Sequence, residues 1–183
     1  MFFVSDALLD QILTDDIPYG DATTALFGIE KIPGIVRCRP KAETTIAGVA
    51  LVERLFARVG LQTTLFHEEG DTVAAGTVIL EGRGPAGAIH AVYKTAQNIL
   101  EYASGIATRT HQMVEEARAG NPLCRVAVTR KHFPGTKTLS LYAAMSGGAV
   151  VHRMGLSESV LVFDQHRVFI PDFEKRLTEA KKA

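Results

Sequence analysis

The chain has 183 residues, of which 46% are hydrophobic and 22% are charged, a composition typical of a folded globular protein. Its 20 basic and 20 acidic residues cancel. The molecule therefore has no net field to attract nucleic acid or an anionic membrane, and we expect neither as a partner. Cys38 and Cys124 are too few for a disulfide framework, and the N-terminus lacks the basic segment and apolar core of a secretory signal. These features predict a cytoplasmic protein.

The first half of the chain alternates helical and strand patterns. Ser5 or Asp6 can cap a short helix with apolar residues at helical spacing, and a second helix is predicted from Val49 to Val59. Residues 35–39, 61–67 and 77–81 have strand patterns. Residues 86–119 are helix-forming, with an expected interruption at Ser104-Gly105, which gives either two helices or one broken helix.

The pattern changes after Gly120-Asn121-Pro122. Short strands are predicted at residues 125–129, 149–152 and 159–163, with helices at 136–146 and 167–182. Strands that alternate with helices favour a parallel sheet, either doubly wound or part of a β/α barrel. Gly147-Gly148 lies before the second of these strands, either as the end of a helix or as a point of close backbone approach.

Basic side chains follow two of these strands. The first ends in Thr129-Arg130-Lys131 and the second in His152-Arg153, whereas the third ends at Phe163. Parallel α/β folds bind ligands at the carboxyl ends of their strands. Because like charges repel unless an anion neutralises them, this set predicts a site for a sugar phosphate or pyrophosphate. The alternative for each single residue is a solvated surface charge. We expect no metal site, because no histidine has the spacing of a metal ligand.

Several segments in order resemble the quinolinate phosphoribosyltransferases, the type II pentosyltransferases of NAD synthesis. The segments are Tyr19-Gly20-Asp21-Ala22-Thr23, Gln97-Asn98-Ile99-Leu100, Ser104-Gly105-Ile106-Ala107-Thr108, Thr129-Arg130-Lys131, Pro134-Gly135, Gly147-Gly148 and His152-Arg153-Met154-Gly155-Leu156. Residues 129–137 and 161–167 look like the ModD branch, which is associated with molybdate transport.

The resemblance implies an N-terminal α/β sandwich, residues 1–105, followed by the first part of an incomplete β/α barrel, residues 106–183. It implies a homodimer or larger oligomer in which the sandwich of one subunit covers the barrel mouth of the other. Arg130, Lys131, His152 and Arg153 match positions that bind the dicarboxylate and phosphoribosyl pyrophosphate, and the first three are the catalytic candidates. Lys94 takes the place of an arginine that reaches across the dimer. The family reaction joins quinolinate to ribose 5-phosphate with magnesium and releases pyrophosphate and carbon dioxide.

Three departures from the family pattern concern the acceptor: Lys94 lacks the planar fork of arginine, Phe163 replaces a lysine, and His132-Phe133 replaces two small hydroxyl residues. We therefore expect transfer of ribosyl phosphate to a small acceptor other than quinolinate. The later barrel strands of the family, with their acidic magnesium ligands, are expected to be missing from these 183 residues. If these residues are the whole protein, we expect it to be incompetent in catalysis; if they are a piece of a longer protein, the parent protein can still be active. The alternatives are a non-catalytic anion-binding or sensor protein of the same fold, and a structural fragment that requires a partner chain.

Overall fold

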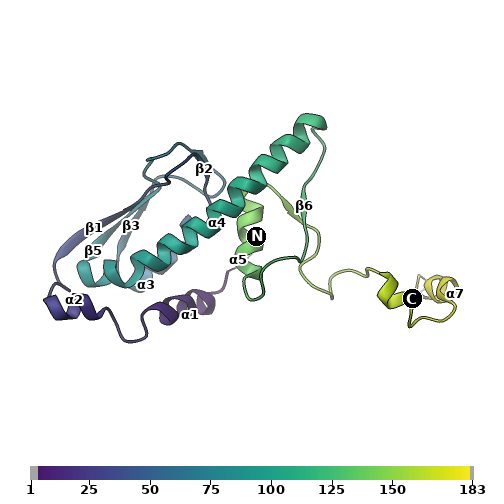
Figure 1. Cartoon of the computed structure of the whole chain (residues 1–183), viewed down its shortest axis with the longest axis horizontal. Helices are drawn as coiled ribbons and strands as arrows, with labels where there is room; N and C mark the ends of the chain where they lie inside the picture. Colours follow the sequence, from purple (N-terminus) through teal and green to yellow (C-terminus); the bar gives the residue numbers. More distant parts are fainter. Residues whose placement is uncertain (1–3, 182–183) are drawn as a thin grey trace. The chain divides into compact units, whose positions relative to one another are not determined.

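The protein is described by a computed structural model over residues 4–181, which form two compact units, residues 4–152 and 153–181 (Figure 1). No helix within residues 4–181 is both long and apolar enough to cross a membrane. The first unit contains α1 (Asp6–Asp16), α2 (Ala22–Phe27), β1 (Pro33–Cys38), β2 (Thr44–Thr45), α3 (Val49–Arg58), β3 (Gln62–Leu65), β4 (Thr72–Val73), β5 (Leu80–Pro85), α4 (Ala86–Gly120), β6 (Ala127–Val128), α5 (Lys137–Ser146) and β7 (Val150–Val151).

An antiparallel sheet with the order β1-β5-β3 forms one layer of the first unit. Helices α3 and α4 cover one face of this sheet (Figure 1). Phe56 of α3 is fully buried and packs so closely on β5 that a Cβ atom at Gly82 would lie 2.6 Å from its ring. The main hydrophobic core therefore lies between the sheet and these helices, which is the arrangement expected for the predicted sandwich.

The predicted first helix is confirmed, and charge pairs dock it on α3. Ser5 caps α1 by accepting a hydrogen bond from the Leu8 backbone N–H. The Asp6 carboxylate lies 2.6 Å from Arg58 Nη2, and Arg58 also pairs with Asp10. These hydrogen bonds hold the pKa of Asp6 below its ordinary value, with the largest contribution from Arg58.

The expected break at Ser104-Gly105 is wrong, because α4 is one continuous helix of 35 residues. Its buried positions run at helical spacing through the predicted break, from Val92 to Val114. Ser104 Oγ contacts the backbone N–H and the carbonyl oxygen of Ala47, both at 3.1 Å, and these hydrogen bonds tie the helix to the segment after β2. Tertiary packing of this face outweighs the cost of one glycine, about 1 kcal/mol relative to alanine.

Glu69 connects the sandwich to α5. Its carboxylate accepts hydrogen bonds from the backbone N–H groups of Gly48, at 2.8 Å, and Ala50, at 3.0 Å, and so caps α3, whose N-cap glycine has no side chain. Burial and a hydrogen bond to the same carboxylate raise the pKa of Tyr142 in α5.

Helix α5 lies directly against α4. A Cβ atom at Gly147, the C-cap of α5, would lie 2.4 Å from the Ala107 carbonyl oxygen. Gly147 is therefore both a helix C-cap and a point of close approach, the two roles considered from the sequence. The strands on either side, β6 and β7, pair in parallel. Each has two residues, so the strands predicted at 125–129 and 149–152 are present but shorter.

The second unit contains α6 (Asp164–Arg167) and α7 (Phe173–Ala180). The strand predicted at residues 159–163 is wrong: this segment has no strand structure, and within the described part of the second unit it has no strand with which to pair. The predicted helix over 167–182 is also interrupted, since residues 168–172 separate α6 from α7. Pro171 lies in this interruption and disfavours a helical conformation of the residue before it.

Candidate functional site at the ends of β6 and β7

The parallel pairing of β6 and β7 places the predicted basic residues at one edge of the sheet. Val128 is the register partner of Val151, and the His152 N–H donates to the Val128 carbonyl oxygen at 3.0 Å. Arg130 and Lys131 follow β6 two and three residues after this pair, and His152 follows β7 by one. The structure therefore brings the two strand ends together, as the sequence pattern required.

A compact turn connects β6 to α5. The Thr136 hydroxyl donates to the Phe133 carbonyl oxygen at 2.8 Å, and Gly135 has a φ of 85° that few other residues adopt. Helix α5 then begins at Lys137 without a side-chain cap. Its N-terminal N–H groups thus follow the basic turn in the chain and add to the positive potential there.

The side chains of Arg130, Lys131 and His152 are exposed. Within residues 4–181, none of the three side chains has a hydrogen-bonding or ion-pair partner. Phe133 is 78% exposed beside them in the same turn, so an aromatic surface borders the basic residues. Exposed basic side chains beside an exposed phenyl ring suit an anion that carries a flat organic group.

Arg153 and Phe163 belong to the second unit. Arg153 follows His152 directly in the chain, and its Nη1 lies 3.4 Å from the Ser159 carbonyl oxygen. Phe163 precedes α6, where its ring stacks on the His166 ring with centroids 6.0 Å apart, and its backbone N–H donates to His166 Nδ1 at 3.1 Å. Phe163 therefore has a defined neighbour at the start of a helix, in place of the predicted position at a strand end.

Within residues 4–181, Lys94 does not contact the other predicted site residues. It lies exposed on α4, where its Nζ donates to Gln97 Oε1 at 3.2 Å. Thirteen residues separate it from Ala107, where α5 contacts α4, a distance of about 20 Å along the helix axis.

No group of three or more histidine, cysteine, aspartate or glutamate side chains that could hold a metal ion occurs within residues 4–181. These residues do not fit a magnesium site made of protein ligands. Residues 4–181 therefore offer no cluster of protein ligands for magnesium.

Sequence reasoning missed a hydrogen-bonded cluster at the start of α4. The Thr24 hydroxyl lies 2.6 Å from Asp21 Oδ2 and 2.6 Å from His90 Nδ1. The hydrogen bond from Thr24 is the largest influence that lowers the pKa of Asp21. Histidine spacing in the sequence could not reveal this cluster, because Thr24 lies 66 residues before His90 in the chain.

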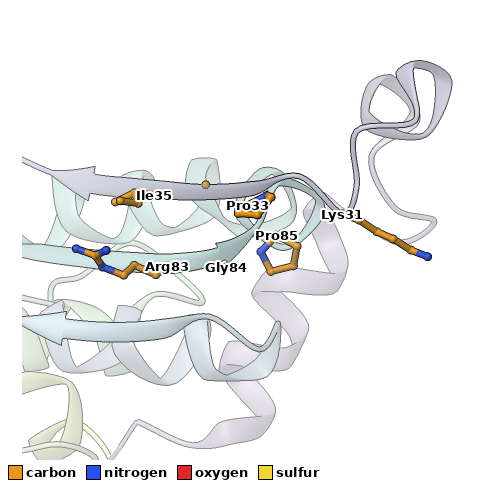
Figure 2. A pocket seen from close by; sticks show the side chains of 7 residues that line it. Lys31, Pro33, Ile35, Arg83, Gly84 and Pro85 are labelled. Atoms are coloured by element: carbon orange, nitrogen blue, oxygen red, sulfur yellow. The ribbon is translucent and has the colours of Figure 1, made fainter.

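Sequence reasoning also missed two cavities of the first unit. One is a shallow hollow on the outer face of the sheet, where Ile35 and Arg83 project away from the helices (Figure 2). Arg83 is paired there with Glu81 at 2.6 Å. The other lies along α4, beside the segment that runs from β1 to β2. None of the predicted site residues lines either cavity.

Comparison with known families accounts for nearly the whole chain. The model described as "Quinolinate phosphoribosyl transferase, N-terminal domain" matches residues 21–104, and the model of the C-terminal domain of the same enzyme matches residues 106–183. The chain belongs to the quinolinate phosphoribosyltransferase family. The resemblance carried by the motifs of the sequence is thus confirmed.

Two curated relatives share the name "Putative pyrophosphorylase ModD". The one from Rhodobacter capsulatus is 40% identical over 169 residues, which cover 92% of this chain and 65% of the relative. The one from Pasteurella multocida is 37% identical over 174 residues, which cover 95% of this chain and 62% of the relative. The chain thus spans somewhat less than two thirds of the length of these relatives.

The nicotinate-nucleotide pyrophosphorylase from Francisella tularensis has a similar solved structure, with a TM-score of 0.86 and 27% identity. The match covers 99% of this chain and 65% of that one. The predicted fold class, an α/β sandwich followed by the first part of an incomplete β/α barrel, is confirmed by this likeness. The predicted division between residues 105 and 106 stays a prediction.

Proposed function

We propose that the protein is a phosphoribosyltransferase of the ModD type. Arg130, Lys131 and His152 at the ends of β6 and β7 bind the phosphate groups of phosphoribosyl pyrophosphate. The observation that carries this proposal is the parallel pairing of β6 with β7, which gathers these residues at one sheet edge. Family membership supports the same reaction class.

The chemistry follows from the charges. In ribosyl transfer, the bond between C1 of the ribose and the pyrophosphate oxygen breaks while the acceptor forms a bond to C1. Negative charge builds up on the leaving pyrophosphate, and cations held in place beforehand stabilise it without further reorganisation. We assign this role to Arg130 and Lys131, and we assign to His152 a hydrogen bond to the same anion.

We propose that the acceptor is a small molecule other than quinolinate. From the likeness to ModD we also propose a link to molybdate transport. Quinolinate carries two carboxylates. An arginine at position 94 could bind a carboxylate through two hydrogen bonds, whereas the lysine present there cannot. Exposed Phe133 offers an aromatic surface instead. Two copies of the chain would be needed if Lys94 contacts the acceptor, because the contacts of one chain do not bring it to the strand ends.

Thermal unfolding with phosphoribosyl pyrophosphate and magnesium tests the proposal. A ligand that binds only the native state at about 100 times its Kd adds about 2.7 kcal/mol to the free energy of unfolding, so the Tm should rise. Arg130→Ala should abolish this rise with little change in the Tm of the free protein. Arg125→Ala is a matched control, because Arg125 is an exposed arginine just before β6 and so lies at the opposite end of the same strand.

An unchanged Tm at millimolar phosphoribosyl pyrophosphate would overturn the proposal. It would also be overturned if Arg125→Ala lost the ligand-induced rise in Tm to the same extent as Arg130→Ala. Pyrophosphate release separates the proposed enzyme from its alternative. Saturable binding without release of pyrophosphate from any acceptor mixture would support a non-catalytic anion-binding protein. Carbon dioxide release from quinolinate at the rate of pyrophosphate release would contradict the proposed change of acceptor.

A further inference from the structure

His132 lies in the turn between β6 and α5, directly after Arg130 and Lys131 in the chain. Its ring Nδ1 lies 3.2 Å from the Phe133 backbone carbonyl oxygen. A carbonyl oxygen can only accept a hydrogen bond, so Nδ1 is the donor and carries a proton. A neutral imidazole has one N–H group, and Nε2 of His132 therefore has a free lone pair. The contact thus fixes which nitrogen of this ring can accept a proton.

The carbonyl group that orients the ring is itself held by the start of α5. It accepts one hydrogen bond from the Thr136 backbone N–H at 3.1 Å and another from the Thr136 hydroxyl at 2.8 Å. Because Thr136 has a single hydroxyl proton, its oxygen accepts from the Ser140 hydroxyl, 3.0 Å away. A base whose ring is oriented by a further group is the arrangement found at catalytic sites.

Nε2 of His132 is available to a ligand. The side chain is half-buried, and the carbonyl contact at Nδ1 is its only hydrogen bond or ion pair within residues 4–181. The ring of Phe133, the next residue, is 78% exposed. The turn therefore offers a proton acceptor and a flat apolar surface directly after the two cations assigned to the leaving pyrophosphate.

The chemistry of ribosyl transfer gives this lone pair a use. Quinolinate attacks through a pyridine nitrogen, which already has a lone pair and loses no proton. A heterocycle that attacks through an N–H group must lose that proton as its bond to C1 of the ribose forms. Imidazole is the side chain that enzymes use most often as a base for such a transfer. A base at this site is therefore not required for quinolinate, whereas an N–H acceptor needs one.

We propose that His132 is the base of the reaction and that the acceptor is a flat heterocycle with an N–H group. As the acceptor nitrogen forms its bond to C1, its proton moves to Nε2 of His132. The bond between C1 and the pyrophosphate oxygen breaks, and its electron pair leaves with pyrophosphate. The imidazolium then gives its proton to solvent. The inference rests on the proposed function and names the acceptor class of the same site.

NMR of the His132 ring nitrogens tests the first step. Protonated and unprotonated ring nitrogens have well-separated shifts in long-range proton–nitrogen correlation spectra. At a pH where the ring is neutral, we expect a proton on Nδ1 and none on Nε2, with the signals assigned by their loss in His132→Asn. A ring protonated on Nε2 would overturn the proposal.

A matched pair of probes tests recognition of the N–H group. Indazole is a flat heterocycle with an N–H group, and 1-methylindazole carries a methyl group in place of that hydrogen. With phosphoribosyl pyrophosphate and magnesium present, we expect saturable amide shifts at residues 130–136 and about tenfold tighter binding of indazole, because one hydrogen bond is gained. Equal affinity for the two compounds, or shifts confined to other residues, would contradict the inference.

Two substitutions of His132 identify the atom responsible. His132→Asn keeps a donor near the place of Nδ1 and has no atom at the place of Nε2, so the preference for indazole should disappear. His132→Gln places an amide oxygen near Nε2, so the preference should persist. The same effect in both variants would refute the assignment to Nε2. His67→Gln is the control and should change nothing, because His67 pairs with Asp71 at 3.5 Å in the segment between β3 and β4.

Pyrophosphate release with indazole as acceptor tests the proton transfer. His132→Gln should bind indazole but release pyrophosphate about a hundredfold more slowly than the wild type, because an amide cannot take up the proton. Release at the wild-type rate, or no release by the wild type with both ligands bound, would overturn the role as base.

The rise in Tm with phosphoribosyl pyrophosphate separates the two proposals. If the wild type shows no rise, the proposed function itself is wrong. If the wild type and both His132 variants show the same rise, but neither the preference for indazole nor the rate depends on His132, only the assignment of the base and the acceptor class is wrong.

Discussion

Glu69 provides the sharpest test of how the sandwich supports the strand-end site. Replacing it with alanine leaves the Gly48 and Ala50 N–H groups without their carboxylate acceptor, and it removes the partner of the Tyr142 hydroxyl. Loss of a helix cap costs about 1 kcal/mol. Leaving a half-buried hydroxyl without its charged acceptor costs about 1–2 kcal/mol more. We therefore expect Glu69→Ala to lower the free energy of unfolding by about 2–3 kcal/mol.

Urea denaturation followed by circular dichroism measures this loss, and the Tm should fall by about 5–10 °C. Glu68→Ala is the matched control, because Glu68 is the exposed neighbour of Glu69. Tyr142→Phe should account for only the hydroxyl part. A loss below about 0.5 kcal/mol for Glu69→Ala, or one no larger than that of Glu68→Ala, would refute the reasoning, since surface substitutions already have effects of this size.

Three further predictions concern packing, pH and thiol reactivity. Gly147→Ala should destabilise the protein by about 1–3 kcal/mol in urea unfolding, because its methyl group would meet a carbonyl oxygen of α4. The pKa of Asp6 is lowered in the folded state, chiefly by Arg58, so its contribution to stability is present above its ordinary pKa of 3.8 and is lost as the pH falls below that value. The Tm of Asp6→Asn should therefore fall less steeply than that of the wild type between about pH 5 and 3. Burial raises the pKa of Cys38 to about 11, so near pH 8 a thiol reagent should label exposed Cys124 first; equal rates would contradict this.

The sequence predicted those elements whose signal is local. The first helix, with its Ser5 cap, and the second, with apolar residues at helical spacing, occur where they were expected. The strand ends at Arg130 and His152 were found because alternating strands and helices constrain topology strongly. The pairing of these two strand ends therefore followed from chain connectivity, although each strand has only two residues, while their role as a site stays a prediction.

The failures have a common physical origin in tertiary contacts. Gly105 lowers local helix propensity, but the hydrogen bonds of Ser104 to Ala47 and the buried face of α4 keep the helix continuous. The apolar run that ends at Phe163 has a strand pattern, yet a strand forms only where another strand can pair with it. Neither the packing partner nor the pairing partner can be identified from a short window of sequence.

The distribution of arginine partners supports an anion site at the strand ends. Arg37, Arg58 and Arg83 all pair with carboxylates: the Arg37 pair joins β1 to β5, the Arg58 pair joins α3 to α1, and the Arg83 pair lies within β5. A chain with as many acidic as basic residues could pair other cations in the same way. The side chains of Arg130 and Lys131 nevertheless have no such partner within residues 4–181. A single unpaired surface cation is ordinary. Two neighbouring ones beside His152, at the carboxyl ends of parallel strands, are what the proposed anion site requires, and they support that proposal.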